Sequence, residues 1–155
     1  EIEGLHILAG QHRKRLGAIS FYIDDMHFNL VVKLLNDHFG IQVRGGCACA
    51  GTYGHCLLKL DRQKSNAILS KIEKGDLYDR PGWIRLSIHP TMSLEDVKFI
   101  TDAIKYVADN KVELAKEYTY NPKKNIFTHN SGEGDLFEDS VLRRFYSDLS
   151  EGVGV

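Results

Sequence analysis

Two cysteines lie close together in a glycine-rich segment, where their thiols could act as nucleophiles. Residues 44–51 read RGGCACAG and include Cys47 and Cys49. A thiol is a useful nucleophile when it is accessible and when its thiolate form is favoured. The glycines give the segment freedom to present a thiol, and Arg44 supplies a positive charge that stabilises a thiolate. The alternative is a cysteine buried as a small hydrophobic side chain.

Metal binding is a second interpretation of the same region. Cys47, Cys49, His55 and Cys56 provide four potential ligands for a metal ion. Their spacing, C-x-C-x5-H-C, differs from the C-x2–4-C pairs that are typical of structural zinc sites. The sequence therefore favours thiol chemistry, and we expect no metal site.

Arg85 is the other candidate for chemistry, because it interrupts an apolar run at residues 83–88. An arginine within a strand either faces solvent or binds a carboxylate, which its planar guanidinium contacts at two points. Strand alternation puts Arg85 on the same face as Trp83 and Ser87, opposite the aliphatic side chains. Periodicity alone favours a solvated arginine on a half-exposed sheet face.

Apolar periodicity predicts the elements that position these residues. The order of strand, helix, strand, helix, strand and helix predicts an α/β (α+β) domain, with a small sheet of about three to four strands and helices packed on it. The expected strands cover residues 17–23, 41–44 and 83–88, and the expected helices cover 28–39, about 57–74, and a long segment that opens at 93 and extends to about 114.

Several residues should begin or end these helices. Asp24 and Asp25 are the expected N-caps of the first helix, and Gly40 is its expected end. The tetrapeptide at residues 93–96 resembles a capping box for the last long helix. On the first helix, His27 and His38 are expected at the surface.

After Tyr118 the character of the chain changes. Residues 120–134 are polar, and a later apolar stripe recurs every four residues on a predicted short helix, at Phe137, Val141, Phe145 and Leu149. We therefore divide the chain into a domain at residues 1–118 and a polar linker with a C-terminal helical extension at residues 119–155. The stripe should dock on a surface, either of this domain or of a neighbour.

Composition limits the classes of function. A chain of 155 residues provides one domain with room for an appendage. Its net charge of −1 gives no electrostatic case for nucleic acid or an anionic membrane, and no apolar run approaches the roughly 20 residues of a membrane span. The 3 cysteines, confined to positions 47–56, indicate reduced thiols in a cytoplasmic protein. Because the chain does not begin with Met, we expect it to be part of a longer polypeptide.

Taken together, these motifs resemble the C-terminal small domain of the class V aminotransferase family, and most closely the cysteine desulfurases and selenocysteine lyases. These are pyridoxal phosphate (PLP) enzymes of fold type I. In one branch the catalytic cysteine lies in R-x-G-x-x-C-A, which Arg44, Gly46, Cys49 and Ala50 match. In another branch the pattern is G-S-A-C, and residues 46–49 match it with Cys in place of Ser. Both alignments place the catalytic cysteine at Cys49.

A second landmark of the family is a strand arginine in a pattern like I-R-F-S, followed by residues that open the last helix. Residues 84–87 (IRLS) and 93–97 (SLEDV) fit that arrangement. The resemblance, which covers residues 1–118, implies that Arg85 binds the α-carboxylate of a small amino-acid substrate.

The resemblance also implies PLP as the cofactor of the complete protein, a large PLP-binding domain in the same polypeptide and a homodimer. In the family the PLP lysine follows a histidine, and none of the 7 histidines here is followed by Lys. We therefore expect the PLP lysine outside this chain, and no cofactor and no activity in the chain alone. Three alternatives stay open: a class V transaminase or lyase without a cysteine nucleophile, a non-catalytic metal-binding or interaction module, and a family member that has kept only a dimerising role.

Overall fold

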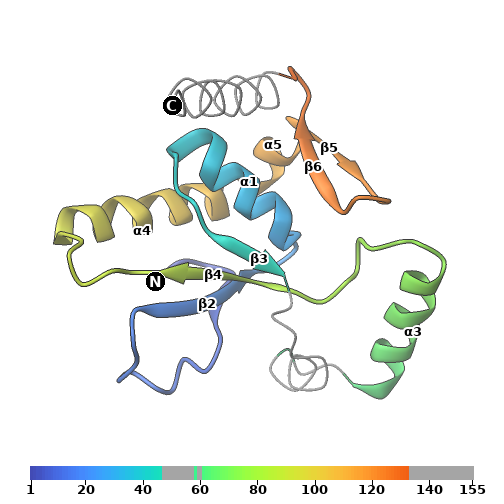
Figure 1. The fold of residues 1–155 in the computed structure, drawn as a ribbon, viewed down its shortest axis with the longest axis horizontal. Helices are drawn as coiled ribbons and strands as arrows, with labels where there is room; N and C mark the ends of the chain where they lie inside the picture. Colours follow the sequence, from blue (N-terminus) through green and yellow to red (C-terminus); the bar gives the residue numbers. More distant parts are fainter. Residues whose placement is uncertain (47–57, 59–60, 133–155) are drawn as a thin grey trace, which may run out of the picture.

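The computed structural model describes residues 1–46, 58 and 61–132, and its centre is a four-stranded antiparallel sheet (Figure 1). The strand order is β1-β2-β4-β3. The strands are β1 (Leu5–Ile7), β2 (Ala18–Ile23), β3 (Arg44–Gly46) and β4 (Trp83–Ser87). The predicted strands are therefore present, although the second one begins only at Arg44 and β1 was not predicted.

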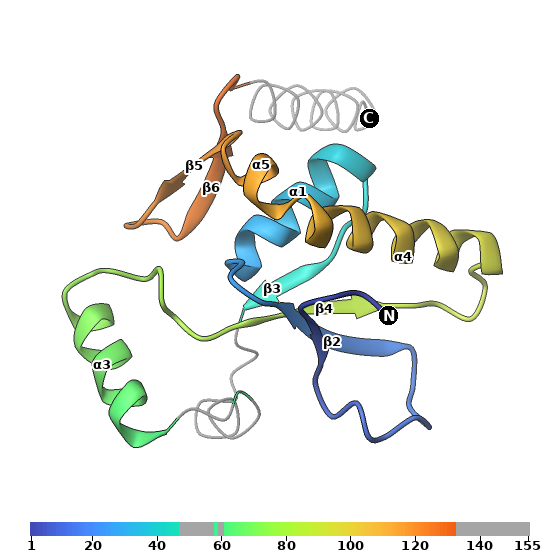
Figure 2. The ribbon, with the colours of Figure 1, turned by 180° about the vertical axis from the view of Figure 1, so that it is seen from behind.

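Helices cover one face of this sheet, namely α1 (Phe28–Phe39) and α4 (Leu94–Asp109) (Figure 1). The other described helices are α3 (Arg62–Glu73) and α5 (Lys111–Ala115). Both views place α1 and α4 on the same side of the sheet, whereas α3 stands apart from it (Figures 1 and 2). The most deeply buried side chains come from the sheet and from these two helices, namely Phe21, Val31, Leu34, Leu35, Ile84 and Val107. The expected class, a small sheet with helices packed on it, is confirmed.

The start of α1 differs from the prediction. Asp24 and Asp25 are not its caps, because the chain first makes a tight turn in which Asp25 has a φ of 58°. The cap is His27, whose Nδ1 accepts a hydrogen bond from the backbone N–H of Asn29 at 3.0 Å. His27 is also buried, so the expectation that it lies at the surface is wrong. The end of the helix is as predicted, with Gly40 in the left-handed conformation at a φ of 65°.

Two glycines let α1 approach the sheet closely. A Cβ on Gly45 would lie 2.9 Å from Val32 and 3.0 Å from the ring of Phe28. A Cβ on Gly82 would lie 2.4 Å from the same ring. The Phe28 ring therefore occupies space that any other residue at position 82 would take, and this contact fixes α1 against β3 and the start of β4.

The last long helix begins as predicted and ends earlier. The hydroxyl of Ser93 accepts a hydrogen bond from the backbone N–H of Asp96, and the carboxylate of Asp96 accepts one from the backbone N–H of Ser93. This capping box is the one predicted from the sequence. The helix does not continue to Leu114, since Asn110 leaves helical geometry and separates α4 from α5.

A β-hairpin occupies the first part of the expected polar linker. It consists of β5 (Tyr118–Asn121) and β6 (Ile126–His129). In its turn, Asn121 Oδ1 accepts from the backbone N–H groups of Lys123 and Lys124, and Asn125 has a φ of 54°. The apolar stripe at residues 137–149 lies outside the described residues, so its predicted helix and the boundary at residue 118 stay predictions.

Candidate functional site

Two arginines face each other on the sheet face that the helices leave uncovered. In the strand register, Arg85 on β4 lies opposite Arg44 on β3 and opposite Ser20 on β2. Directly opposite residues in an antiparallel pair share a face, so these three side chains point to the same side. Both arginine side chains are exposed, whereas Ile84 and Leu86 beside Arg85 are buried. The predicted alternation is confirmed at these positions.

The two guanidinium groups have no anionic partner among the described residues. Among residues 1–46, 58 and 61–132, neither Arg44 nor Arg85 forms a hydrogen bond or an ion pair. Like charges directly opposite each other in a sheet destabilise it, and solvent screening reduces that cost without removing it. An anion held between the two guanidinium groups would reverse the sign of this interaction, because each group offers paired N–H donors to a carboxylate.

A fixed imidazole and an aromatic ring lie on the same face. Tyr22 is two residues beyond Ser20 on β2, and its ring stacks on that of His6 with centroids 4.8 Å apart. His6 Nε2 lies 2.9 Å from Asp24 Oδ2, which holds the imidazole in one orientation. Trp83 shares this face with Arg85 but is only 6% exposed, so the expectation of a half-exposed face fails at that position.

The candidate nucleophile follows this site along the chain. Cys47, Cys49, His55 and Cys56 lie outside the described residues, so their predicted roles stay predictions. Their segment begins directly after Gly46, the last residue of β3, which pairs with Trp83 on β4. Three residues of extended chain span about 10 Å. Position 49 is therefore within reach of the surroundings of Arg85.

His89, which follows β4, does not join the arginines. Its Nδ1 lies 2.7 Å from the hydroxyl of Thr91, and it also accepts from the backbone N–H of Thr91 at 3.3 Å. The ring is exposed and committed to this local turn. Within the part of the chain that the structure describes, no group of three or more His, Cys, Asp or Glu side chains could hold a metal ion.

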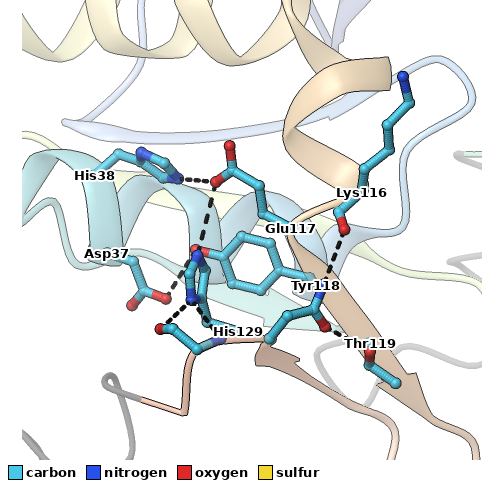
Figure 3. Close-up of polar contacts among 9 residues, drawn as sticks. Asp37, His38, Lys116, Glu117, Tyr118, Thr119 and His129 are labelled. Atoms are coloured by element: carbon cyan, nitrogen blue, oxygen red, sulfur yellow. Dashed lines mark hydrogen bonds and ion pairs between the residues drawn. The ribbon is translucent and has the colours of Figure 1, made fainter.

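A second polar cluster, which the sequence did not predict, joins α1 to the hairpin (Figure 3). The Tyr118 hydroxyl donates to Asp37 Oδ2 at 2.9 Å. Burial and this carboxylate raise the pKa of Tyr118 far above its ordinary value. Glu117 Oε2 lies 3.5 Å from His38 Nε2 and 3.8 Å from His129 Nε2. No motif connects residues so far apart in the chain, and only the fold brings them together.

His27 is a further residue whose environment the sequence did not reveal. Four aromatic rings surround it, those of Phe28, Tyr78, Tyr120 and Phe127, with centroids 4.4 to 5.6 Å from its own. Its Nε2 is buried and has no hydrogen-bond partner among the described residues. Burial lowers the pKa of His27, although Asn125 and Asp79 partly oppose the shift. The neutral imidazole therefore serves as a cap and as a core side chain.

Comparison with known proteins assigns the chain to a family. The model of the aminotransferase class-V family matches residues 1–100, which is more than half of the chain. No curated protein matches it. Within the described residues, every helix is too short or too polar to cross a membrane. Members of the matching family generally depend on PLP. The matched residues contain the whole four-stranded sheet with its two arginines, and the chain belongs to the class-V aminotransferase family.

Proposed function

We propose that the chain is the C-terminal small domain of a cysteine desulfurase-like PLP enzyme, in which Cys49 is the nucleophile and Arg85 binds the substrate. The observation that carries this proposal is an exposed arginine that has no partner among the described residues and lies opposite the strand that leads into the cysteine segment. Membership of the class-V aminotransferase family supports the amino-acid substrate and the cofactor.

The proposed task of Arg85 is to bind and orient the substrate. A guanidinium that has no partner among the described residues can form two parallel hydrogen bonds to an α-carboxylate. Because β4 is an inner strand of the sheet, its backbone is held on both sides and the bound carboxylate is fixed in position. Arg44 lies opposite and adds a second positive charge beside the same anion.

The side chains of the sheet suit a bound substrate carboxylate better than a covalently attached cofactor. None of the four strands of the sheet contains a lysine, and the strand residues on the face of Arg85 are arginine, serine, histidine, aromatic residues, one alanine and one glycine. We therefore place the PLP lysine in the large domain of the same polypeptide. When bound there, PLP would supply the electron sink that allows a bond to the substrate's β-carbon to break.

The proposed task of Cys49 is to accept sulfur. Its thiolate attacks the sulfur of L-cysteine, so that a sulfur–sulfur bond forms while the carbon–sulfur bond of the substrate breaks. The bonding electrons remain with the carbon skeleton, which takes up a proton and leaves as alanine. The enzyme retains a persulfide on Cys49, and the positive charge of Arg44 five residues earlier favours the thiolate that begins the reaction.

The test uses the full-length protein with PLP and L-cysteine. We expect a mass increase of one sulfur atom that maps to the peptide containing Cys49 and that disappears in Cys49→Ser. Cys47→Ser and Cys56→Ser are the matched controls, and both should keep the adduct. PLP bound without an adduct on any cysteine would instead indicate the alternative, a class V transaminase or lyase in which Cys49 is incidental.

A separate experiment tests Arg85. Arg85→Gln should raise KM for L-cysteine more than it lowers kcat, because the lost contact holds the substrate and does not take part in bond breaking. The loss of a paired charge-assisted contact corresponds to about 10- to 100-fold in kcat/KM. An unchanged KM would remove Arg85 from the substrate site and leave the role of Cys49 to be judged by the adduct alone.

A further inference from the structure

We propose that a groove along α1 binds an uncharged, extended segment of another polypeptide, which pairs with the free edge of β6. The groove is lined by one side of α1, by the two residues that lead into β3 and by β6. Neither Arg44 nor Arg85 is among the described residues that line it. The inference therefore goes beyond the proposed function and does not depend on it.

The free edge of β6 is the one that faces away from β5. The backbone N–H of Asn130 donates to the carbonyl of Glu117 at 2.8 Å, so residues 126, 128 and 130 direct their backbone groups toward β5. Phe127 stands at the alternate position and directs its backbone N–H and C=O to the opposite side. Among the described residues, neither of these two groups forms a hydrogen bond. A strand edge with unpaired N–H and C=O groups is a template for a further strand.

The groove runs beside this edge. All of its lining residues on β6 are consecutive, at positions 126–128, and Gln42 and Val43 line it from the segment that leads into β3. Four residues of α1 line it at helical spacing and share one side of the helix, namely Asn29, Val32, Lys33 and Asn36. This stretch of helix extends about 10 Å, which is the length of about three residues of extended chain. Both views place β6 between β5 and α1 (Figures 1 and 2).

The side chains of the groove suit an uncharged peptide. Three of them are amides, at Asn29, Asn36 and Gln42. Amide side chains both donate and accept hydrogen bonds, as the peptide groups of a bound strand do. Val32 and Val43 add apolar surface for its side chains. Lys33 is the one charged side chain among the described lining residues, and it forms an ion pair with Asp37 at 3.5 Å. The groove therefore offers hydrogen bonds and apolar contact without an unpaired charge.

These contacts define the composition of the occupant. Three residues that lie along the edge, with one neighbour on each side, make an uncharged run of about five residues. The end of this chain does not supply such a run, because every five consecutive residues within 133–155 include an Asp, Glu or Arg. An uncharged segment of a partner polypeptide that is rich in Thr and Val fits, since these residues favour extended backbone and strand addition uses backbone hydrogen bonds.

Fluorescence anisotropy on the complete chain tests the proposal with a defined probe. The probe is the fluorophore-labelled peptide acetyl-Thr-Val-Thr-Val-Thr, and we expect it to bind saturably. The same peptide methylated on its backbone nitrogens is the matched control, since it has lost the donors that a strand edge requires. It should bind at least about tenfold more weakly. Absence of saturable binding, or equal binding of the two peptides, would overturn the proposal.

A pair of protein variants locates the binding site. Gln42 and Gln11 are both exposed, and of the two only Gln42 lines the groove. Gln42→Glu removes an amide donor and introduces a charge, so it should weaken binding of the unmethylated peptide at least about tenfold. Gln11→Glu makes the same chemical change on the connection between β1 and β2 and should leave binding unchanged. Equal effects of the two substitutions would overturn the proposal.

Two further results would assign the groove to a different occupant and would also overturn the proposal. Peptide binding that appears only after removal of residues 133–155 would make the occupant the end of the same chain. Self-association of the chain, followed by light scattering and abolished by Gln42→Glu, would make it a second copy. None of these measurements uses enzyme activity, so their outcome is independent of the roles proposed for Cys49 and Arg85.

Discussion

At the scale of the residue, His27 combines two roles that are usually separate. It caps α1 through Nδ1, and its buried ring packs among four aromatic rings. The sequence offered no signal for this, because the two aspartates just before it are the commoner N-caps. Arg85 was predictable, since a single charged residue within an apolar strand identifies itself by alternation. The position of Arg85 directly opposite Arg44 was not predictable, because strand register depends on the fold.

The first prediction concerns the pH dependence of folding stability. Because the pKa of His27 is lowered in the folded chain, the unfolded chain binds a proton more readily. The contribution of His27 to the free energy of unfolding is fully present above its pKa in the unfolded chain, about 6.5. It is lost as the pH falls through the lower pKa of the folded chain. In His27→Asn, which keeps a capping side chain, the urea midpoint should decline less steeply between pH 7 and pH 5. An equally steep decline would assign the pH effect to other groups.

The second prediction concerns the two arginines. Replacing Arg44 by Gln should raise the free energy of unfolding by a few tenths of a kcal/mol at low ionic strength, because a like-charge contact is removed. The gain should disappear in about 1 M salt, where the screening length falls to about 3 Å. Denaturant titrations of both proteins at the two salt concentrations measure it. A gain that is independent of salt would show that charge repulsion is not its cause.

At the scale of the element, the hairpin shows why a polar composition does not by itself indicate a linker. Its strands are short, and isolated two-stranded hairpins are marginal in water. This one packs on α1, with Tyr118 bonded to Asp37 and Asn29 Nδ2 donating to the carbonyl of Asn125 at 2.6 Å. Those partners are 81 and 96 residues away in the sequence, so local patterns could not reveal them. Helices with strong apolar periodicity, such as α1 and α4, were predictable because their signal is local.

The third prediction concerns this attachment. Tyr118→Phe removes the hydroxyl that donates to Asp37 and leaves a carboxylate without that donor, which should cost about 1–3 kcal/mol of unfolding free energy. The matched control is Tyr22→Phe, because the Tyr22 hydroxyl has no hydrogen-bond partner among the described residues. Chemical denaturation of the two variants measures the difference. Equal stability of both would mean that packing alone attaches the hairpin.

At the scale of the whole molecule, the helices that the structure describes cover only one face of the sheet (Figures 1 and 2). Helices bury one face, and the other presents the arginines, the His6–Tyr22 stack and the strand that leads to the cysteines. In the proposed enzyme this face turns toward the large domain that holds PLP. Sequence patterns could predict the layer and the family, but not which face stays uncovered, because that depends on where helices far apart in the chain pack.

The fourth prediction follows from this one-sided arrangement. The chain alone should lose added PLP on dialysis, and borohydride reduction should attach it to no single lysine in stoichiometric amount, since the sheet strands contain no lysine. The full-length protein, treated identically, should be labelled at one lysine outside this chain. Peptide mapping by mass spectrometry reads both results. Stoichiometric labelling of one lysine within residues 1–155 would contradict the proposal that the PLP lysine lies in the large domain.

The pairing of Gly46 with Trp83 has a consequence for how such a domain can change over evolutionary time. The pairing holds together the two ends of residues 47–82, so this segment begins and ends at neighbouring positions of the sheet. The entropy of closing a flexible loop grows slowly with its length, by roughly 0.6 kcal/mol for each doubling. Insertions and deletions in this segment should therefore change the free energy of folding only slightly, and Arg85 keeps its position on β4. The segment that contains the cysteines can therefore change in length or sequence while the position of Arg85 on β4 stays the same.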